Sequence, residues 1–154
     1  MKLNKKQIKG IVIVLQAFLV AALFLPAGTI TGEVKINDTS LSVFGMIDRY
    51  AGMGFSDDAL FYMVMACAFP VAIILSILFL KERTNFGAAV VISAFYATAS
   101  ACFFSSAKRK MVDYATLTSI PYLIIFVSLV SMMLLILGFF YAAPSEPDEK
   151  NKND

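Results

Sequence analysis

Polar chemistry inside the apolar part of this chain is limited to neutral side chains. Four long apolar runs contain no charged residue, and Gln16 is the most strongly polar group within them. Charged side chains inside a membrane usually mark proton relays, ion paths or substrate sites. A glutamine can instead bond to a neighbouring helix or line a polar cavity, and the sequence leaves both roles open for Gln16. Proton-coupled transport by this chain alone is therefore disfavoured.

The usual groups of enzyme and metal chemistry are missing from the sequence. It has no histidine, which removes the commonest general base and metal ligand. It also lacks a Gly-x-Ser-x-Gly motif and a phosphate-binding loop. Its two cysteines, Cys67 and Cys102, lie inside apolar runs and are interpreted as small apolar fillers, although a bond between them is left open. We expect no catalytic residue, no metal site and no cofactor, and thus no enzyme.

Three consecutive basic residues stand at the end of the third apolar run. Lys108, Arg109 and Lys110 follow the third run directly and could attract anionic lipid head groups, with simple anchoring as the alternative. The net charge of the whole chain is only +2, and its lysines are scattered. Nucleic-acid binding needs a basic face, so the composition gives no support for it.

Small side chains recur at every fourth position of the third apolar run. This spacing places them in a nearly straight strip on one face of a helix, where another backbone can approach closely. The strip is interpreted as a helix-packing surface, either within this chain or between copies of it. Its members are Ala89, Ser93, Ala97, Ala101 and Ser105.

The apolar runs that carry these residues have the length of membrane spans. A helix needs about 20 mostly apolar residues to cross the hydrocarbon core, and in lipid each backbone polar group must be paired within its own segment. The sequence therefore predicts an all-α integral membrane protein, a four-transmembrane-helix bundle forming a single membrane domain over residues 1–143. The predicted spans are about 10–25, 59–80, 86–107 and 121–143.

The loop at residues 27–58 is the longest segment between predicted spans. Residues 29–36 and 40–44 alternate in polarity and flank Asn37-Asp38, which suits a tight turn, so we expect a small β-hairpin. Residues 46–50 are interpreted as a short helical turn. The order of a helix, a hairpin loop and three further helices resembles that of claudin-type membrane proteins in topology. The tryptophans, Gly-Leu-Trp motif and cysteine pair of that family's loop are absent, so no residue and no function is carried over.

Charge sets the predicted orientation. Four lysines precede the first run, and the positive-inside rule then places both termini in the cytoplasm and the loop at 27–58 outside it. The triplet at 108–110 is the exception to this rule. Residues 144–154 are polar and are predicted to form a disordered cytoplasmic tail. Composition favours a bacterial plasma membrane.

Without reactive groups, the sequence favours a role in binding. We expect a non-enzymatic accessory, assembly or structural subunit that contacts the lipid bilayer and other membrane or surface proteins, chiefly through the extracytoplasmic loop. The alternative is an oligomeric pore or transport component, with Gln16 and the hydroxyl groups lining a path. A homo-oligomer is left open.

Overall fold

Long helices dominate the computed structural model, which describes residues 4–30, 40–79, 82–113 and 115–141. The predicted turn at Asn37-Asp38 and the predicted tail at 144–154 lie outside these residues. In chain order the elements are α1 (Lys5–Ala22), β1 (Pro26–Ile30), β2 (Ser40–Ser42), α2 (Val43–Gly52), α3 (Ser56–Phe79), α4 (Glu82–Lys110), β3 (Ala115–Leu117) and α5 (Ile120–Tyr141).

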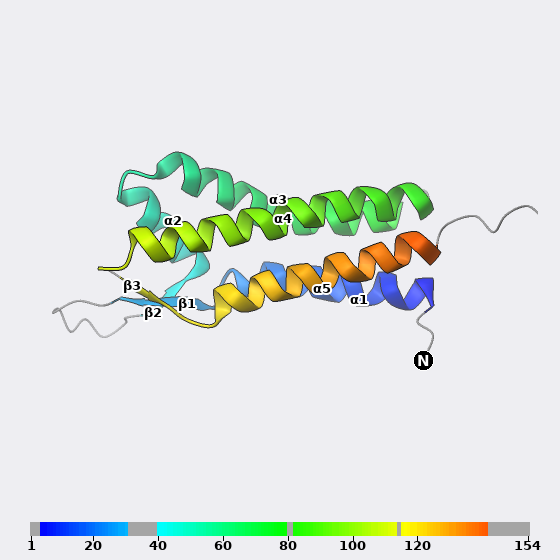
Figure 1. The fold of residues 1–154 in the computed structure, drawn as a ribbon, viewed down its shortest axis with the longest axis horizontal. Helices are drawn as coiled ribbons and strands as arrows, with labels where there is room; N and C mark the ends of the chain where they lie inside the picture. Colours follow the sequence, from blue (N-terminus) through cyan, green and yellow to red (C-terminus); the bar gives the residue numbers. More distant parts are fainter. Residues whose placement is uncertain (1–3, 31–39, 80–81, 114, 142–154) are drawn as a thin grey trace, which may run out of the picture.

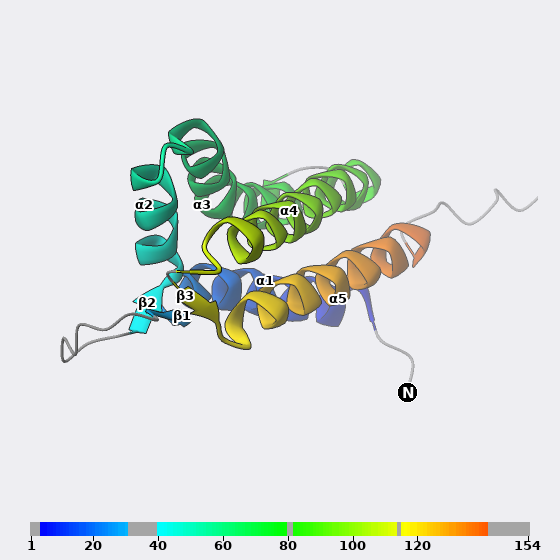
Figure 2. The ribbon, with the colours of Figure 1, turned by 60° about the vertical axis from the view of Figure 1, so that its left-hand side comes forward.

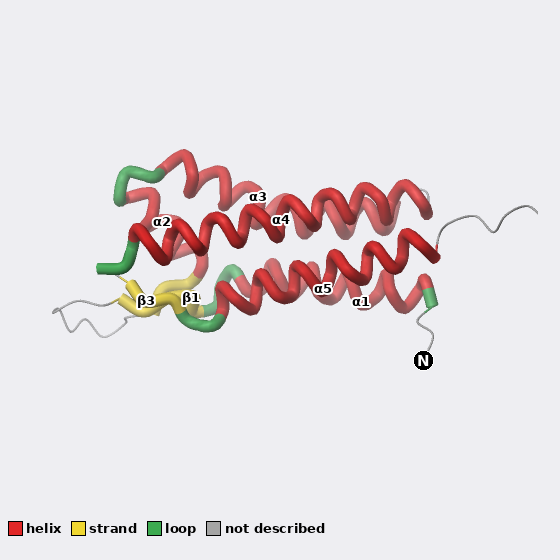
Figure 3. Tube along the Cα trace, in the orientation of Figure 1, coloured by secondary structure: helices red, strands yellow, loops and turns green. Residues whose placement is uncertain are grey.

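The four longest of these helices pack as a closed ring. α1 contacts α3 and α5, and α4 contacts the same two helices from the other side. The start of α1 and the end of α5 lie at one end of the bundle (Figure 1). The strands and α2 lie together at the opposite end, as Figures 2 and 3 show. We call this end the sheet end.

Three described helices are long and apolar enough to cross a membrane: α3, α4 from Thr84, and α5. Only about a third of each span is buried inside the protein, so most of its apolar surface points outward. Large exposed side chains such as Phe61, Phe95 and Phe126 lie on these helices. An apolar surface of this extent requires lipid or another apolar partner around it.

The first helix differs from the predicted span at 10–25. Asn4 caps α1 in a capping box with Gln7, so the helix begins at Lys5 and includes three lysines. It ends at Ala22, because Pro26 cannot continue a helix and opens β1. The helical part after Lys9 is 13 residues, or about 20 Å long. Four spans are therefore not established, since α1 is not among the helices that qualify.

The small sheet has the strand order β2-β1-β3, with both pairs antiparallel. β1 and β2 form the arms of the expected hairpin, but β1 begins at Pro26 and β2 ends at Ser42. The third strand comes from the segment between α4 and α5, where none was predicted. The hydroxyl of Thr118 donates to the carbonyl oxygen of Pro26 at 2.7 Å, and the hydroxyls of Thr29 and Thr116 lie 2.7 Å apart. These bonds tie the segment that follows α1 to the segment that joins α4 to α5.

The strand predicted over residues 40–44 is wrong after Ser42. The hydroxyl of Ser42 accepts a hydrogen bond from the backbone N–H of Gly45 and caps α2. Val43 therefore begins a ten-residue helix, longer than the turn expected at 46–50. The buried side chains of α2 are Val43, Met46, Ile47 and Tyr50, which share one helical face. This face covers the sheet end of the core.

The core has two apolar clusters, one near each end of the bundle. The larger includes Leu19, Tyr62 and Tyr96 and extends under α2, whereas the smaller includes Val12, Ile73 and Leu135. Buried polar side chains lie between these clusters along three of the helices. We call this set the polar layer; its members are Gln16, Ser93, Ser128 and Ser131.

Candidate functional site at the sheet end of the bundle

Gln16 lies fully buried in the polar layer. Its Nε2 donates a hydrogen bond to Oγ of Ser131 at 2.6 Å, which joins α1 to α5. Its Oε1 has no hydrogen-bond partner among the residues that the structure describes. Of the two roles left open for Gln16, this bond gives the amide group a contact between helices.

The rest of the polar layer is also neutral and bonded within the bundle. Oγ of Ser93 donates to the carbonyl oxygen of Ser128 at 3.5 Å, and Oγ of Ser128 donates to that of Ile124 at 2.7 Å. The first bond joins α4 to α5, and the second stays within α5. Such groups can position helices, but they carry no charge for a proton relay.

The strip of small residues on α4 divides into two parts. Ala89, Ser93 and Ala97 are buried within the bundle. Ala101 and Ser105 are exposed and line a groove between α4 and α5. Steps of four residues advance by about 40° relative to a turn of 3.6 residues, so the strip winds out of the core toward the sheet end.

The basic triplet also divides, since successive helical residues point in different directions. Nζ of Lys110 lies 3.9 Å from a carboxylate oxygen of Asp58 on α3 and 3.6 Å from the centroid of the Phe55 ring. Nζ of Lys108 donates to the hydroxyl of Tyr122 on α5 at 3.4 Å. Nε of Arg109 donates to the carbonyl oxygen of Ser105 at 3.3 Å within α4.

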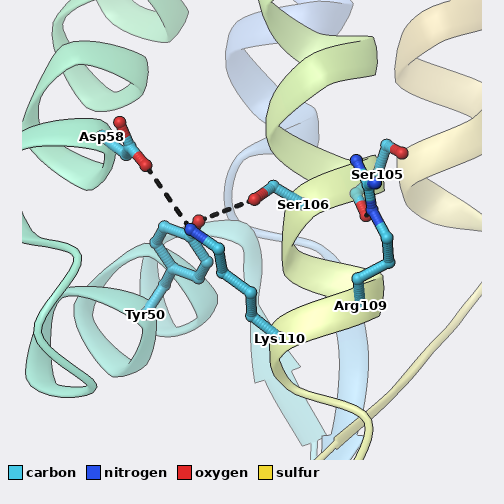
Figure 4. A network of polar contacts seen from close by, with 6 residues as sticks. All are labelled: Tyr50, Asp58, Ser105, Ser106, Arg109 and Lys110. Carbon is cyan, nitrogen blue, oxygen red and sulfur yellow. Dashed lines mark hydrogen bonds and ion pairs between the residues drawn. The ribbon is translucent and has the colours of Figure 1, made fainter.

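Lys110 belongs to an interaction cluster that joins α2, α3 and α4 (Figure 4). Besides the contacts of Lys110, the hydroxyls of Tyr50 and Ser106 are hydrogen bonded at 2.8 Å. Figure 4 shows Lys110 reaching toward Asp58 across the ring of Tyr50, while Arg109 points away from the cluster. Beside it lies a cavity of about 350 Å³, lined in part by Tyr50, Asp58, Tyr62, Cys102 and Phe103.

Aromatic rings pack against one another in this region. The rings of Tyr62 and Phe103 stack with centroids 4.2 Å apart, and the ring of Tyr50 meets that of Phe103 at 5.3 Å. Aromatic pairs at these separations add to the energy of apolar burial. The lining of the cavity therefore combines aromatic side chains with the carboxylate of Asp58, which lies 3.9 Å from Nζ of Lys110.

A second hollow, of about 550 Å³, lies beside the C-terminal end of α2 and the turn that follows it. Its lining residues are Arg49, Gly52, Met53 and Phe55. Arg49 is exposed, and Asp48 beside it is exposed as well. This hollow combines apolar side chains with one cation, which is a common composition for the anchor region of a protein interface.

Sequence reasoning missed the cluster at the sheet end as a unit. Residues 43, 46, 47 and 50 carry the i, i+3, i+4, i+7 pattern of a helix face, and this signal could have found α2. The pairing of Asp58 with Lys110 has no local signal, because the two residues are far apart in the chain. Cys67 and Cys102 are free and exposed, so the bond between them that the sequence left open is not formed.

Comparisons with known proteins find no relative of this chain. A scan against protein-family models gives no match. Searches of curated proteins and of solved structures also give none.

Proposed function

We propose that this chain is a non-enzymatic accessory or assembly subunit that lies in a membrane. In this proposal it binds partner proteins through the sheet end of its bundle. The observation that carries the proposal is the difference in polar groups between the buried polar layer and the sheet end. The polar layer holds neutral groups that bond to neighbouring backbone and side chains. The exposed charges of Asp48, Arg49 and Asp58 and the hollow beside α2 lie at the sheet end.

The described part of the sheet end is suited to binding because contacts within the chain hold its elements in place. β1 pairs there with β2 and with β3, which comes from the second half of the sequence. The buried side chains of Met46, Ile47 and Tyr50 anchor α2. A preformed surface loses little conformational entropy on association. An apolar side chain of a partner, next to a carboxylate that reaches Arg49, would fit the hollow.

In this proposal all four long helices span a bacterial plasma membrane, α1 included, with both termini in the cytoplasm and the sheet end outside. The lysines of α1 would then lie at the cytoplasmic head groups, and their long side chains could reach water from a short apolar stretch. This orientation is supported by the start of α1 and the end of α5, which lie at the same end of the bundle (Figure 1).

The test is affinity purification from native membranes in mild detergent, followed by mass analysis of the isolated complex. Gly52→Leu places a larger side chain in the hollow, and its Cβ meets no atom within 4 Å. We expect the wild-type chain to retain a defined set of foreign subunits and Gly52→Leu to lose them. Gly10→Leu is the matched control, since Gly10 is equally open but lies on α1.

The alternative of an oligomeric pore predicts a different result. A purified homo-oligomer that conducts ions in liposomes, with no foreign subunit bound in membranes, would contradict the proposal. Retention of the same partners by Gly52→Leu would show that the hollow beside α2 is not the binding surface.

A further inference from the structure

A groove of about 220 Å³ runs between α4 and α5 close to the sheet end. Its polar end carries Lys108 and Tyr122, and its apolar part includes Ala101, Pro121 and Ile125. It is distinct from the hollow beside α2. The groove places the ammonium group of Lys108 next to apolar side chains of α4 and α5. Both helices are long and apolar enough to span a membrane.

Among the residues that the structure describes, the charge in this groove has no acidic partner. The ammonium group of Lys108 donates to the neutral hydroxyl of Tyr122, and, within the described parts of the chain, neither Lys108 nor Arg109 forms an ion pair. Lys110, by contrast, lies against Asp58. The first turn of α5 contains no acidic residue, so the positive end of its dipole adds to the potential at the groove.

The residues at the polar end of the groove are of the kinds typical of the region where lipid head groups meet hydrocarbon. Lys108 and Arg109 are exposed at the end of α4, and the exposed Tyr122 near the start of α5 has the amphipathic character typical of an interfacial residue. Farther along α5, Phe126 and Leu129 are exposed apolar residues that would face acyl chains. A lipid can therefore reach both parts of the groove at once.

We propose that this groove binds one anionic phospholipid from the leaflet at the sheet end. The phosphate accepts hydrogen bonds from Nζ of Lys108 and from the hydroxyl of Tyr122, which turns its proton toward the phosphate while still accepting from Lys108. Part of one acyl chain lies along Ala101 and Ile125, with the remainder in the bilayer. The inference rests on the membrane location of α4 and α5 and not on partner binding at the sheet end.

Native mass spectrometry of the detergent-solubilised full chain tests the site, with dioleoylphosphatidylglycerol and dioleoylphosphatidylcholine as probes. We expect the wild-type chain to bind one phosphatidylglycerol in preference to phosphatidylcholine. Lys108→Gln should weaken this binding about fivefold, the loss expected for one basic residue near an anionic head group. Lys110→Gln is the matched control and should leave the affinity for phosphatidylglycerol nearly unchanged, because Lys110 is already paired with Asp58.

A second variant separates a seated lipid from general surface charge. Ala101→Leu fills the apolar part of the groove without altering any charge, and it should also reduce phosphatidylglycerol binding. If Lys108→Gln does not fold, this variant decides the question. Equal binding of the two lipids, equal losses for Lys108→Gln and Lys110→Gln, or unchanged binding by Ala101→Leu would each overturn the proposal.

A separate control distinguishes the phosphate of a lipid from that of a soluble compound. Glycerol 3-phosphate carries a phosphate but no acyl chain, so it should not compete with phosphatidylglycerol at equal concentration. Full competition would assign the site to a soluble phosphate compound and reject a lipid. Retention of foreign subunits by Lys108→Gln in native membranes would separate the lipid site from the proposed partner surface.

Discussion

Gln16 and Ser131, which are 115 positions apart in the chain, are joined by a buried hydrogen bond of 2.6 Å. We predict that Ser131→Ala destabilises the fold by about 1 kcal/mol, because the amide of Gln16 then loses its partner in an apolar interior. Gln16→Leu combined with Ser131→Ala should cost less than the sum of the two single changes. Reversible unfolding in mixed detergent micelles measures each free energy.

Thr98→Ala is the matched control for this pair. The hydroxyl of Thr98 is exposed and donates to the carbonyl oxygen of Ala94 within the same helix, so its loss should change stability little. Strict additivity of the Gln16 and Ser131 changes would show that the bond contributes no coupling between α1 and α5.

Gly138 packs directly against the ring of Phe86. A Cβ at this position would overlap one ring carbon and lie 2.6 and 2.8 Å from two others, and Phe86 is fully buried. We predict that Gly138→Ala destabilises the chain by about 1–3 kcal/mol through overpacking, although alanine is the better helix former. Thermal unfolding in detergent measures the change.

Two comparisons make this prediction specific. Gly10→Ala should be neutral or stabilising, because a Cβ at Gly10 meets no atom within 4 Å. Adding Phe86→Leu to Gly138→Ala should recover part of the loss, since the smaller side chain leaves room for the methyl group. Wild-type stability of Gly138→Ala would mean that the two helices are not in this close contact.

The two halves of the α4 strip should respond differently to enlargement. Ala97 is only 6% exposed, so Ala97→Leu is predicted to destabilise the bundle by about 1–3 kcal/mol. Ala101→Leu should leave thermal stability in detergent close to that of the wild-type chain, because Ala101 is exposed. Equal stability of both variants would argue against packing by the buried half of the strip.

Sequence patterns could predict the long helices because their signal is local. The runs that became α3, α4 and α5 have the length and apolar character that a helix in lipid requires. The end of α1 was misplaced because hydropathy continues to Leu25, whereas the backbone turns before Pro26. A change of backbone direction inside an apolar run leaves no trace in hydropathy.

The third strand and the sheet-end cluster depend on contacts that are distant in sequence. β3 has three residues and pairs with β1 through Gly28 and Leu117, so no alternation long enough to predict it exists. The alternation of residues 40–44 favoured a strand, but burial of Val43 and Met46 on one face, with Ser42 as the cap, favours α2. Tertiary burial overrides a short local pattern here.

The bond between Tyr50 and Ser106 should stabilise the sheet end more than the ion pair beside it. Tyr50 is fully buried and its hydroxyl lies 2.8 Å from that of Ser106, so Tyr50→Phe is predicted to cost about 1 kcal/mol. The Asp58 side chain is 67% exposed, so Asp58→Asn should change stability by less than about 0.5 kcal/mol. Thermal unfolding in detergent at low and high salt compares them: only the small effect of Asp58→Asn should shrink with salt. A larger loss for Asp58→Asn than for Tyr50→Phe would mean that charge pairing, and not the buried hydroxyl bond, holds α2 against α4.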